Sequence, residues 1–310
     1  MKVVAPGKVL LFGAYSVLEG TRALVIAVDR YAVADTEHLA PSASREVRAA
    51  IGDEPAPTLD LRALHEGTSG GQKLGLGSSA AALVATLGAR AAERGRDLAD
   101  PRVRRALFLD AKRAHADAQG GGSGVDVAAS TYGGALFYAM DPDALGADES
   151  ALGMESAALP AGLAFEVFWS GRSARTSELV AQAMKLKEAD GATFERAIDA
   201  IGDCVTASHA ACARGDLAGF VAAGRANARA LADLGRAADA PIVPPAFAEL
   251  AGLAEREGGA FYPSGAGGGD VGVWLGGGAP SREFLEQAGA SGMVSLGLGI
   301  DRAGVRMRED

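Results

Sequence analysis

The stretch KLGLGSSAAA at residues 73–82 joins a glycine- and serine-rich turn to an alanine-rich segment that runs to Glu93 without a proline. Alanine favours helix, and Ser78 or Ser79 is a natural N-cap, so the pattern predicts a helix over residues 79–94. The glycines permit tight turns and leave no side chain in the way of a ligand. Free N–H groups and the helix dipole make such a start an anion site, and a nucleotide triphosphate fits it. An ordinary serine-capped helix after a glycine turn is the alternative.

The length and composition describe a folded protein with a large core. A chain of 310 residues exceeds the usual single core, so two domains or one large α/β unit are expected. With 48% hydrophobic and 22% charged residues, the composition excludes an intrinsically disordered chain. A formal net charge of -9 argues against non-specific binding to nucleic acid, although local cations in a cleft can still bind an anionic substrate.

The sequence has no recognisable targeting or membrane segment. No apolar run approaches the length of a membrane span. Residues 1–8 reach a proline and a glycine too early for the apolar region of a signal peptide. We therefore expect a cytoplasmic protein without a membrane partner.

The two cysteines, Cys204 and Cys212, lie on a predicted helix with His209 between them. These three residues are the nearest approach to a metal-binding cluster, but nothing nearby completes a zinc set. Buried free thiols are the better interpretation. The four histidines show no metal-ligand spacing, and His115 is interpreted as a residue on a helix face, although it precedes a glycine cluster and can line a site.

Short hydrophobic stretches and longer helical patterns are mixed in both halves of the chain. Strands are predicted at residues 2–12, 23–34, 134–139, 163–169, 271–275, 293–298 and 304–307. Helices are predicted at residues 79–94, 101–119, 177–187, 194–214, 217–234 and 244–256. Residues 35–60 are polar and contain prolines, which indicates irregular strands and loops, and residues 141–161 are the best candidate for a domain boundary. The fold class is therefore α+β or α/β.

Three well separated glycine-rich segments carry the strongest indication of function. The first is PGKVLLFGAYSVL at residues 6–18, the second is the stretch at 73–82, and the third is YPSGAGGGDVG at residues 262–272. Each is weak alone, but their order and form together resemble those of the GHMP kinases. The resemblance spans residues 4–275, which is nearly the whole chain.

Four stretches point, within this family, to the phosphomevalonate kinases. The segment PSGAGGGD at residues 263–270, the loop region at residues 119–129 and WSGRSARTS at residues 169–177 are similar to theirs. The fourth stretch, Gly13-Ala14-Tyr15, departs from the Gly-Glu-His or Gly-Glu-Tyr of many family members. Eukaryotic phosphomevalonate kinases tolerate a small residue at this position.

The resemblance implies the two-domain α+β GHMP kinase fold, with an N-terminal α/β domain of a type also found in ribosomal proteins and a C-terminal ferredoxin-like α+β domain. We expect the N-terminal domain, with the ATP phosphate loop and the catalytic aspartate, to span residues 1–155. The C-terminal domain, with the acceptor side and the third glycine-rich segment, is expected to span residues 156–310. The resemblance places the active site in the cleft between the two domains.

The resemblance also implies ATP and Mg²⁺ as cofactors. The residues implied in ATP binding, mostly through the backbone of the glycine-rich turn, are Lys73, Gly75, Leu76, Gly77, Ser78, Ser79 and Ala80. The Ser78 hydroxyl is the implied magnesium ligand, because hard oxygen donors suit that ion; simple helix capping is its alternative role. Where many relatives have a carboxylate near magnesium this chain has Ala14, so water, another acid such as Glu19, or nothing takes its place.

The resemblance makes Asp126 and Lys8 the implied catalytic residues. Asp126, in a loop of small residues, would accept the proton of the attacking oxygen or orient that oxygen. Lys8 would lie near Asp126, keep it ionised and offset the charge that develops on the phosphoryl oxygens. Without the resemblance, a solvated loop aspartate and a surface lysine are the simpler interpretations.

An acceptor that is already phosphorylated needs donors beyond those that hold ATP. Arginine suits bidentate phosphate contact, although each arginine taken singly is more simply a surface charge. The residues implied in substrate binding are Tyr15, Ser123, Gly124, Ser170, Arg172, Ser173, Arg175, Arg229, Ser264, Gly265 and Gly267. Lys73 and Arg113 are further candidate cations, and Asp270 either joins the site or braces its turn.

The expected activity is ATP- and magnesium-dependent phosphorylation of (R)-5-phosphomevalonate to (R)-5-diphosphomevalonate, a step of isoprenoid synthesis. The alternatives are a mevalonate kinase or another GHMP small-molecule kinase, a diphosphomevalonate decarboxylase, and a catalytically silent member that binds a ligand or partner. The expected partner is a small phosphorylated molecule, and the chain is expected to be a monomer or a homodimer.

Overall fold

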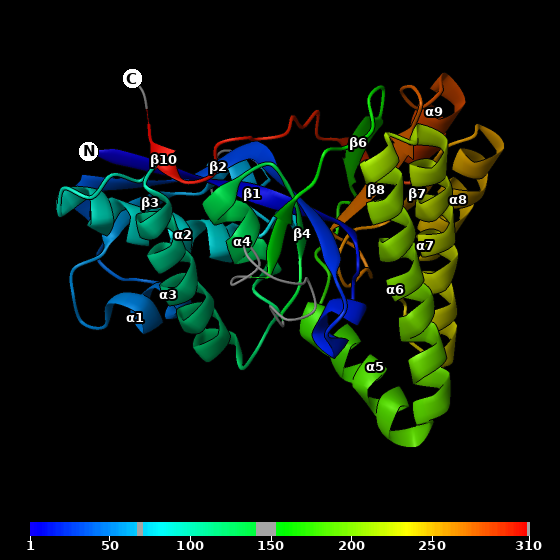
Figure 1. The fold of residues 1–310 in the computed structure, drawn as a ribbon, viewed down its shortest axis with the longest axis horizontal. Coiled ribbons are helices and arrows are strands. Elements are labelled where there is room, and N and C mark those ends of the chain that lie inside the picture. The colour runs from blue at the N-terminus through cyan, green and yellow to red at the C-terminus, as the bar shows by residue number, and fades with distance from the viewer. Residues whose placement is uncertain (67–70, 141–152, 309–310) are drawn as a thin grey trace. The chain divides into compact units, whose positions relative to one another are not determined.

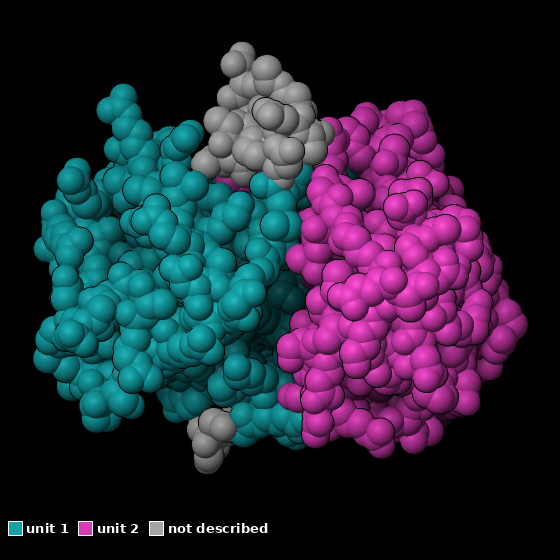
Figure 2. Space-filling model, turned by 90° about the horizontal axis from the view of Figure 1, so that it is seen from below, with its two compact units in different colours: residues 1–9, 25–140, 299–310 teal, residues 10–24, 141–298 magenta. Residues whose placement is uncertain are grey.

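The computed structural model describes residues 1–66, 71–140 and 153–308 of the chain. It forms two compact units, which Figure 2 shows in different colours. The first comprises residues 1–9, 25–140 and 299–310, and the second comprises residues 10–24 and 141–298. The units are thus discontinuous, whereas we expected two continuous domains that meet at residues 155 and 156. Most of the expected boundary segment, residues 141–152, lies outside the described residues.

The end of the chain belongs to the first unit because it pairs with the beginning. β10 (Arg306–Met307) is antiparallel to β1 (Lys2–Phe12), with Val3 opposite Met307 and Val4 opposite Arg306. This pairing adds the predicted strand at residues 304–307 to a sheet that the N-terminus begins. The boundary between the units therefore cannot be a single point in the sequence.

The sheet of the first unit has the strand order β10-β1-β2-β4, and β3 (Pro57–Asp60) pairs with β2 (Ala23–Leu39). The predicted strands at residues 2–12, 23–34 and 134–139 are confirmed as β1, β2 and β4 (Ala135–Tyr138). β2 is longer than predicted because its polar second half continues the pairing with β3. Its first six residues are all buried, as expected for an uninterrupted apolar run.

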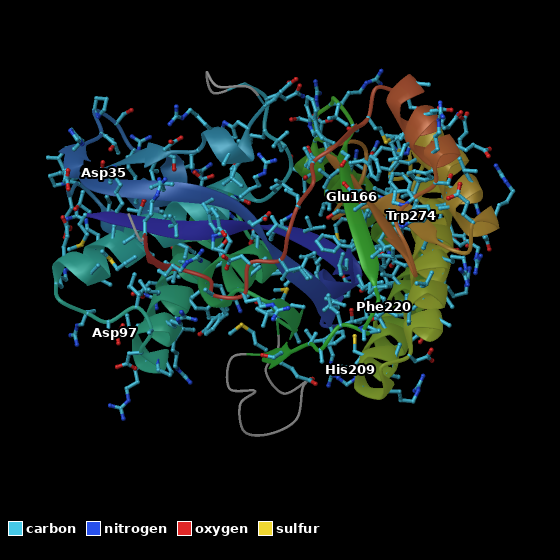
Figure 3. All side chains as sticks on the ribbon, turned by 90° about the horizontal axis from the view of Figure 1, so that it is seen from above. Asp35, Asp97, Glu166, His209, Phe220 and Trp274 are labelled. Atoms are coloured by element: carbon cyan, nitrogen blue, oxygen red, sulfur yellow. The ribbon has the colours of Figure 1, made fainter. Side chains whose placement is uncertain are left out.

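Helices α1 (Arg45–Ile51), α2 (Ser78–Glu93), α3 (Pro101–Gln119) and α4 (Val125–Tyr132) lie on one face of this sheet (Figures 1 and 3). Gly88 lets α2 approach the strands closely. A Cβ at this position would lie 2.8 Å from Val305 Cγ2 and 3.1 Å from Val3 Cγ1. The short 3₁₀ turns η1 (Ser16–Glu19) and η2 (Arg62–Leu64) complete the early part of the chain.

The helices predicted at residues 79–94 and 101–119 are confirmed as α2 and α3. By contrast, α1 lies in the segment that we predicted to be irregular. This helix has seven residues, and Val47 is its buried residue. A helix of two turns with one buried side chain leaves no repeating apolar pattern in the sequence.

The sheet of the second unit has the strand order β7-β8-β6-β9, and all of its pairs are antiparallel. In chain order, β6 (Ala164–Trp169) is followed by helices, then by β7 (Ala260–Pro263) and β8 (Val271–Gly276), a further helix and β9 (Val294–Ser295). This succession is the one expected for a ferredoxin-like domain. The short strand β5 (Met154–Ser156) precedes it.

Helices α5 (Thr176–Ala189), α6 (Gly191–Arg214), α7 (Leu217–Ala237) and α8 (Pro245–Arg256) include the four helices predicted in this half. α7 and α8 pack on β7, and α8 also packs on α9 (Arg282–Ala290), which was not predicted. An aromatic cluster fills the core, with the Phe261 ring centroid 5.3 Å from that of Phe284 and 6.0 Å from that of Phe168. Trp274 on β8 lies 4.8 Å from Phe284 (Figure 3).

The cysteines of α6 are buried free thiols, as predicted. Burial raises the pKa of Cys204 and of Cys212 to about 11, so neither is a thiolate at neutral pH. His209 pairs instead with Glu155, at 3.1 Å. Within the described residues no cluster of histidine, cysteine or acidic side chains is suited to a metal ion, and no helix has the length and hydropathy of a membrane span.

Candidate active site

The predicted anion site lies where α2 begins. Gly77 occupies the N-cap position with a left-handed φ of 75°, and no side chain caps the helix. The prediction that Ser78 or Ser79 is the cap is therefore wrong, because both serines lie within the first turn. Gly75 also has a left-handed φ, of 78°, which glycine adopts readily. The first amides of α2 have no capping partner in their own helix, so they are available to an anion.

Strand β1 brings Lys8 to this turn. The Lys8 amide donates to the Leu76 carbonyl at 2.8 Å, so the strand is hydrogen-bonded to the loop itself. Gly7 makes the approach possible, since a Cβ there would lie 2.8 Å from the same carbonyl oxygen. The side chain of Lys8 passes Gly77 and places its ammonium 3.5 Å from the Gly75 carbonyl. Lys8 thus brings a positive charge to the glycine-rich turn.

Helix α4 brings Asp126 to the same place. Ser130 on α4 donates to the Pro6 carbonyl of β1 at 2.7 Å, which fixes the helix against the strand. A Cβ built on Gly77 would lie 3.0 Å from Lys8 Cγ and 3.7 Å from Asp126 Cβ. The expected meeting of the glycine-rich turn, the lysine and the aspartate is therefore present within the first unit.

The side chain nearest to the Asp126 carboxylate differs from the expected one. Among the described residues no ion pair joins Asp126 to Lys8, whose ammonium is directed at the Gly75 carbonyl. Asp126 Oδ2 lies instead 3.7 Å from His115 Nε2, and Asp126 Oδ1 accepts a hydrogen bond of 2.9 Å from the Val127 amide. Lys8 and Asp126 therefore lie near each other on either side of Gly77, as expected, without a direct ion pair among the described residues.

In the second unit, the third glycine-rich segment is held by Tyr15 and Ser264. The Tyr15 hydroxyl donates to the Ala266 carbonyl at 2.6 Å, and burial raises the pKa of Tyr15 well above its usual value. The buried Ser264 hydroxyl accepts a hydrogen bond of 3.0 Å from the Leu10 amide. These two hydrogen bonds thus join the third glycine-rich segment to residues 10–15 of the first one and fix its shape.

Asp270 joins the third segment to the loop at residues 170–174. Its Oδ1 accepts from the Ala174 amide at 3.0 Å, its amide donates to the Arg172 carbonyl at 2.7 Å, and its carbonyl accepts from the Ser170 amide at 2.8 Å. Asp270 is therefore a brace, which is one of its two expected roles. The loop carries Arg172, whose exposed guanidinium has no hydrogen bond or ion pair with any described residue.

Comparison with known proteins agrees with this arrangement. The family of the GHMP kinases N terminal domain matches residues 42–134. The phosphomevalonate kinase of Streptomyces sp. (strain CL190) is 32% identical in an alignment of 338 positions, which covers 87% of this chain and 88% of that protein. The chain belongs to the GHMP kinase family.

Two further relatives of this GHMP kinase bear on its fold and subfamily. The mevalonate kinase of Archaeoglobus fulgidus is 28% identical over 64% of this chain and 68% of that protein. The structure of Streptococcus pneumoniae phosphomevalonate kinase in complex with phosphomevalonate and AMPPNP has a TM-score of 0.75 at 21% identity, and the match covers 97% of this chain and 99% of that one. The second match establishes the fold.

Two of the expected substrate-binding arginines of this GHMP kinase are engaged elsewhere. Arg175 pairs with Glu178 at 3.1 Å, and Arg229 pairs with Glu255 of α8 at 2.9 Å. No hydrogen bond or ion pair of the described residues joins either arginine to the third glycine-rich segment. Of the three expected arginines, Arg172 is therefore the one whose guanidinium has no hydrogen bond or ion pair with a described residue.

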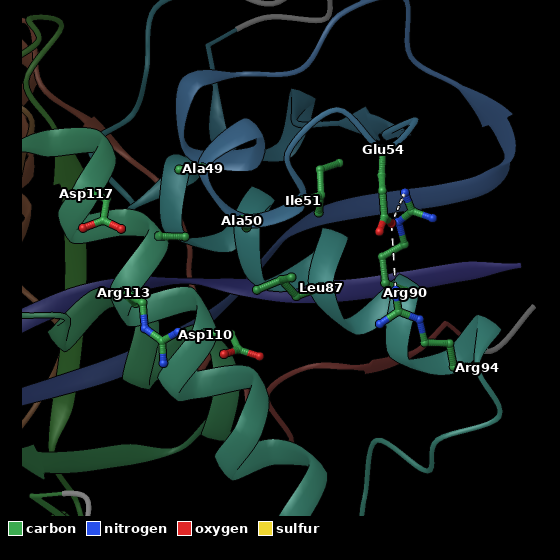
Figure 4. A pocket seen from close by; sticks show the side chains of 11 residues that line it. Ala49, Ala50, Ile51, Glu54, Leu87, Arg90, Arg94, Asp110, Arg113 and Asp117 are labelled. Atoms are coloured by element: carbon green, nitrogen blue, oxygen red, sulfur yellow. Dashed lines mark ion pairs between the residues drawn. The ribbon is translucent and has the colours of Figure 1, made fainter.

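Arg113 lies away from the glycine-rich turn. It lines a cavity of about 350 Å³ between α1, α2 and α3, together with Leu87 and Arg90 (Figure 4). Arg90 in this cavity is engaged by Glu54 at 3.2 Å. The cavity opens beside the later turns of α2, because Leu87 and Arg90 lie more than two turns beyond Ser78.

Ser123 and Gly124 shape the start of α4. The Ser123 hydroxyl accepts from the Val125 amide at 3.3 Å, and the Ser123 carbonyl accepts from the Tyr138 hydroxyl. A Cβ on Gly124 would lie 3.0 Å from Lys112 Cγ, and the φ of +79° at this position also favours glycine. Burial, followed by the charge of Asp126, raises the pKa of Tyr138 far above its usual value.

Glu19, the acid expected as a possible replacement for a carboxylate at Ala14, is already paired in the structure. Ala14 is buried, and the Glu19 carboxylate is bound by the Lys187 ammonium at 2.6 Å. The Ser78 hydroxyl, in contrast, belongs to a buried residue and has no hydrogen bond with any described residue. One unengaged hard oxygen fits Mg²⁺, which keeps several waters and binds through phosphate oxygens.

His115 lies at the site, although its position in the sequence favoured a residue on a plain helix face. His115 and Gln119 lie four residues apart on α3, so they share a helix face, and this face is the one that meets Ser79 and Asp126. The spacing was visible in the sequence. Its significance was not, because the docking of α3 against α2 and α4 decides which face is turned to the site.

Replacing Gly267 by alanine is expected to lower the free energy of unfolding by about 2–4 kcal/mol. Gly267 has a φ of +78°, and a Cβ there would lie 2.0 Å from the Ile242 carbonyl oxygen. Gly265→Ala is the matched control, because Gly265 also has a positive φ, of +69°, but has no atom within 4 Å of an added Cβ. Equal losses of stability in urea denaturation of both variants would contradict the steric argument.

Proposed function

We propose that this GHMP kinase transfers the γ-phosphoryl group of ATP to the phosphate of (R)-5-phosphomevalonate, which gives (R)-5-diphosphomevalonate and ADP. The observation that carries the proposal is the meeting of Lys8, Asp126 and the uncapped start of α2 in the first unit. The similarity to a phosphomevalonate kinase over most of both chains supports the choice of acceptor.

In this proposal the first unit binds ATP. The amides of Gly75 to Ser79 donate to the phosphate oxygens, and Lys8 adds a positive charge at the same turn. Ser78 is the side chain that holds Mg²⁺, and the bound ion supplies positive charge to the phosphates of ATP. Lys73 lies at the beginning of the same loop, where its charge also affects Glu46.

The reaction needs positioning more than a strong base. An oxygen of the acceptor phosphate attacks the γ-phosphorus, a new P–O bond forms, and the bond from the γ-phosphorus to the bridging oxygen breaks, so that ADP leaves with that electron pair. A phosphate monoester is largely a dianion at neutral pH, so the attacking oxygen needs little proton removal. Asp126 therefore acts mainly by orienting the acceptor and fixing the charge distribution, while Lys8 offsets charge on the phosphoryl oxygens.

The acceptor phosphate is assigned to groups of the second unit. Arg172 offers an unengaged guanidinium, and the third glycine-rich segment offers amides in a shape that Tyr15, Ser264 and Asp270 hold. Guanidinium groups bind phosphate through paired hydrogen bonds. This assignment gives Tyr15 and Ser264 a supporting function through the segment rather than a direct contact.

The decisive experiment measures ADP release by the purified protein with ATP and Mg²⁺ in three separate reactions. The first contains phosphomevalonate, the second mevalonate and the third no acceptor. We expect ADP release with phosphomevalonate alone. Release with mevalonate alone would make the chain a mevalonate kinase, an outcome that the 28% identity to such an enzyme makes worth testing. No release with any acceptor would indicate a silent binding protein.

Arg172→Gln is expected to raise the KM for the phosphorylated acceptor roughly 10- to 100-fold, because a charge-assisted hydrogen bond to phosphate is lost. The KM for ATP is expected to stay at the wild-type value. Arg282→Gln is the matched control, since Arg282 is 91% exposed and pairs with Glu286 on α9. Steady-state kinetics with both substrates varied measures the effect, and an unchanged acceptor KM in Arg172→Gln would remove Arg172 from the acceptor site.

A further inference from the structure

His115 is a buried polar residue that the proposed reaction does not yet use. Its side chain is 6% exposed. Its Nε2 atom lies 3.0 Å from the Gln119 side-chain nitrogen, 3.4 Å from Ser79 Oγ and 3.7 Å from Asp126 Oδ2. One ring nitrogen of α3 therefore faces the first turn of α2 and the first turn of α4 at once.

This position matters because the Asp126 side chain is otherwise lightly held. Its Oδ1 accepts one hydrogen bond, from the adjacent Val127 amide, and its side chain is 20% exposed. A carboxylate with one backbone bond can still turn about its last torsion. The His115 ring nitrogen Nε2 lies beside the other oxygen, Oδ2, at 3.7 Å.

The His115 ring is itself held from the opposite side. Gln119 approaches both His115 Nε2 and Ser79 Oγ, the latter at 3.5 Å. Burial raises the pKa of Glu46, but hydrogen bonds, including the one from Gln119, and the charge of Lys73 outweigh burial and lower it below its ordinary value. Glu46 and Lys73 thus lie near the Gln119 side chain as opposite charges.

We propose that His115 is a positioning residue that holds the Asp126 carboxylate and the Ser79 hydroxyl in the single arrangement that phosphoryl transfer requires. The ring is assigned no contact with the acceptor or with ATP, and it acts through Asp126 and through the start of α2. The inference rests on the proposed function, since it needs a reaction for Asp126 to orient. It adds that the arrangement is imposed from α3, by His115 and by the Gln119 side chain that lies against its ring.

The first test compares two substitutions of His115. His115→Leu removes the nitrogen and keeps a side chain of similar bulk, and it is expected to lower kcat roughly 10- to 100-fold, the size of effect that misplacement of a reacting group produces. The KM values for ATP and acceptor are expected to stay at the wild-type level. His115→Gln, which can return a nitrogen to the Nε2 position, is expected to recover most of the lost kcat.

His38→Gln is the matched control, because His38 is 71% exposed in the same unit and pairs with Asp35. It is expected to have wild-type kcat. The thermal unfolding midpoint of each variant identifies losses of kcat that are caused by misfolding. If His115→Leu does not fold, the kcat of the His115→Gln variant still tests the proposal. Wild-type kcat in His115→Leu would overturn the proposal. Equal losses in the leucine and glutamine variants would also overturn it, because ring packing rather than the nitrogen would then matter.

The second test combines His115→Leu with Asp126→Asn. A residue that acts through Asp126 adds little once Asp126 is changed, so the double variant is expected to match Asp126→Asn alone. Multiplied losses would contradict the inference. The two proposals can fail separately. If the wild-type protein releases ADP with phosphomevalonate and His115→Leu releases it at the same rate, only the role of His115 is rejected. A wild-type protein that releases no ADP with any acceptor rejects both.

Discussion

Asp126→Asn is expected to lower kcat roughly 10²- to 10⁴-fold while the protein stays folded. Asparagine has the shape of aspartate, and its side-chain oxygen can still accept the hydrogen bond from the Val127 amide. The change therefore removes the negative charge and the Oδ2 acceptor without removing the local support of α4. Because the lost interaction is used in the transition state, kcat and kcat/KM for the acceptor are expected to fall together.

The control for this prediction is Asp110→Asn on α3. Asp110 is exposed and has no hydrogen bond or ion pair with any described residue, so the same chemical change at that position is expected to leave kcat at the wild-type value. Steady-state ADP release with saturating ATP and acceptor gives the comparison. Near-wild-type turnover of Asp126→Asn would remove Asp126 from the mechanism and would leave Lys8 and the start of α2 as the functional groups of the first unit.

Elements with local boundary residues were predictable from the sequence. α3 begins where the Asp100 side chain accepts from the Arg102 amide and Pro101 opens the first turn, and it ends at Gly120 in the left-handed conformation. These residues determine the ends of a helix through contacts within a few positions of the chain. The prediction for residues 101–119 accordingly agrees with the structure.

Elements fixed by distant contacts were not predictable in the same way. β10 belongs to the first unit because its two residues pair with β1, about 300 positions earlier in the chain. α1 depends on one buried side chain, Val47, and on the Ser44 cap. Neither the β10–β1 pairing nor α1 produces a recognisable pattern in a single sequence. The expectation of two continuous domains therefore did not include the return of β10 to the first unit.

The sequence predicted which segments form the candidate site, but it did not predict the individual side-chain contacts within it. Motif order indicated that the glycine-rich turn, Lys8 and Asp126 lie together, and the distances around Gly77 agree. The sequence could not show that the Lys8 ammonium turns to the Gly75 carbonyl, or that His115 approaches Asp126. Rotamers and the rotation of α3 about its axis decide these contacts, and both depend on packing.

Lys8→Met is expected to lower kcat roughly 10²- to 10³-fold, the loss that follows when one donor to developing negative charge is removed from an active site. Methionine keeps an unbranched stem, which can still pass Gly77, where a Cβ would lie 3.0 Å from Lys8 Cγ. The backbone bond from the Lys8 amide to the Leu76 carbonyl is unaffected. The variant therefore removes the charge and leaves the strand attached to the turn.

Lys2→Met makes the same change on the same strand and isolates the effect of position. Lys2 is 48% exposed and approaches Asp35 at 4.0 Å, so its loss is expected to leave kcat unchanged. Lys8→Arg is expected to restore only part of the activity, because a planar guanidinium cannot follow the path of the lysine stem past Gly77 to the same point. If Lys8→Met keeps wild-type kcat but binds ATP more weakly, the charge acts in ground-state binding alone, and the amides at the start of α2 must then carry the stabilisation of the transferred phosphoryl group.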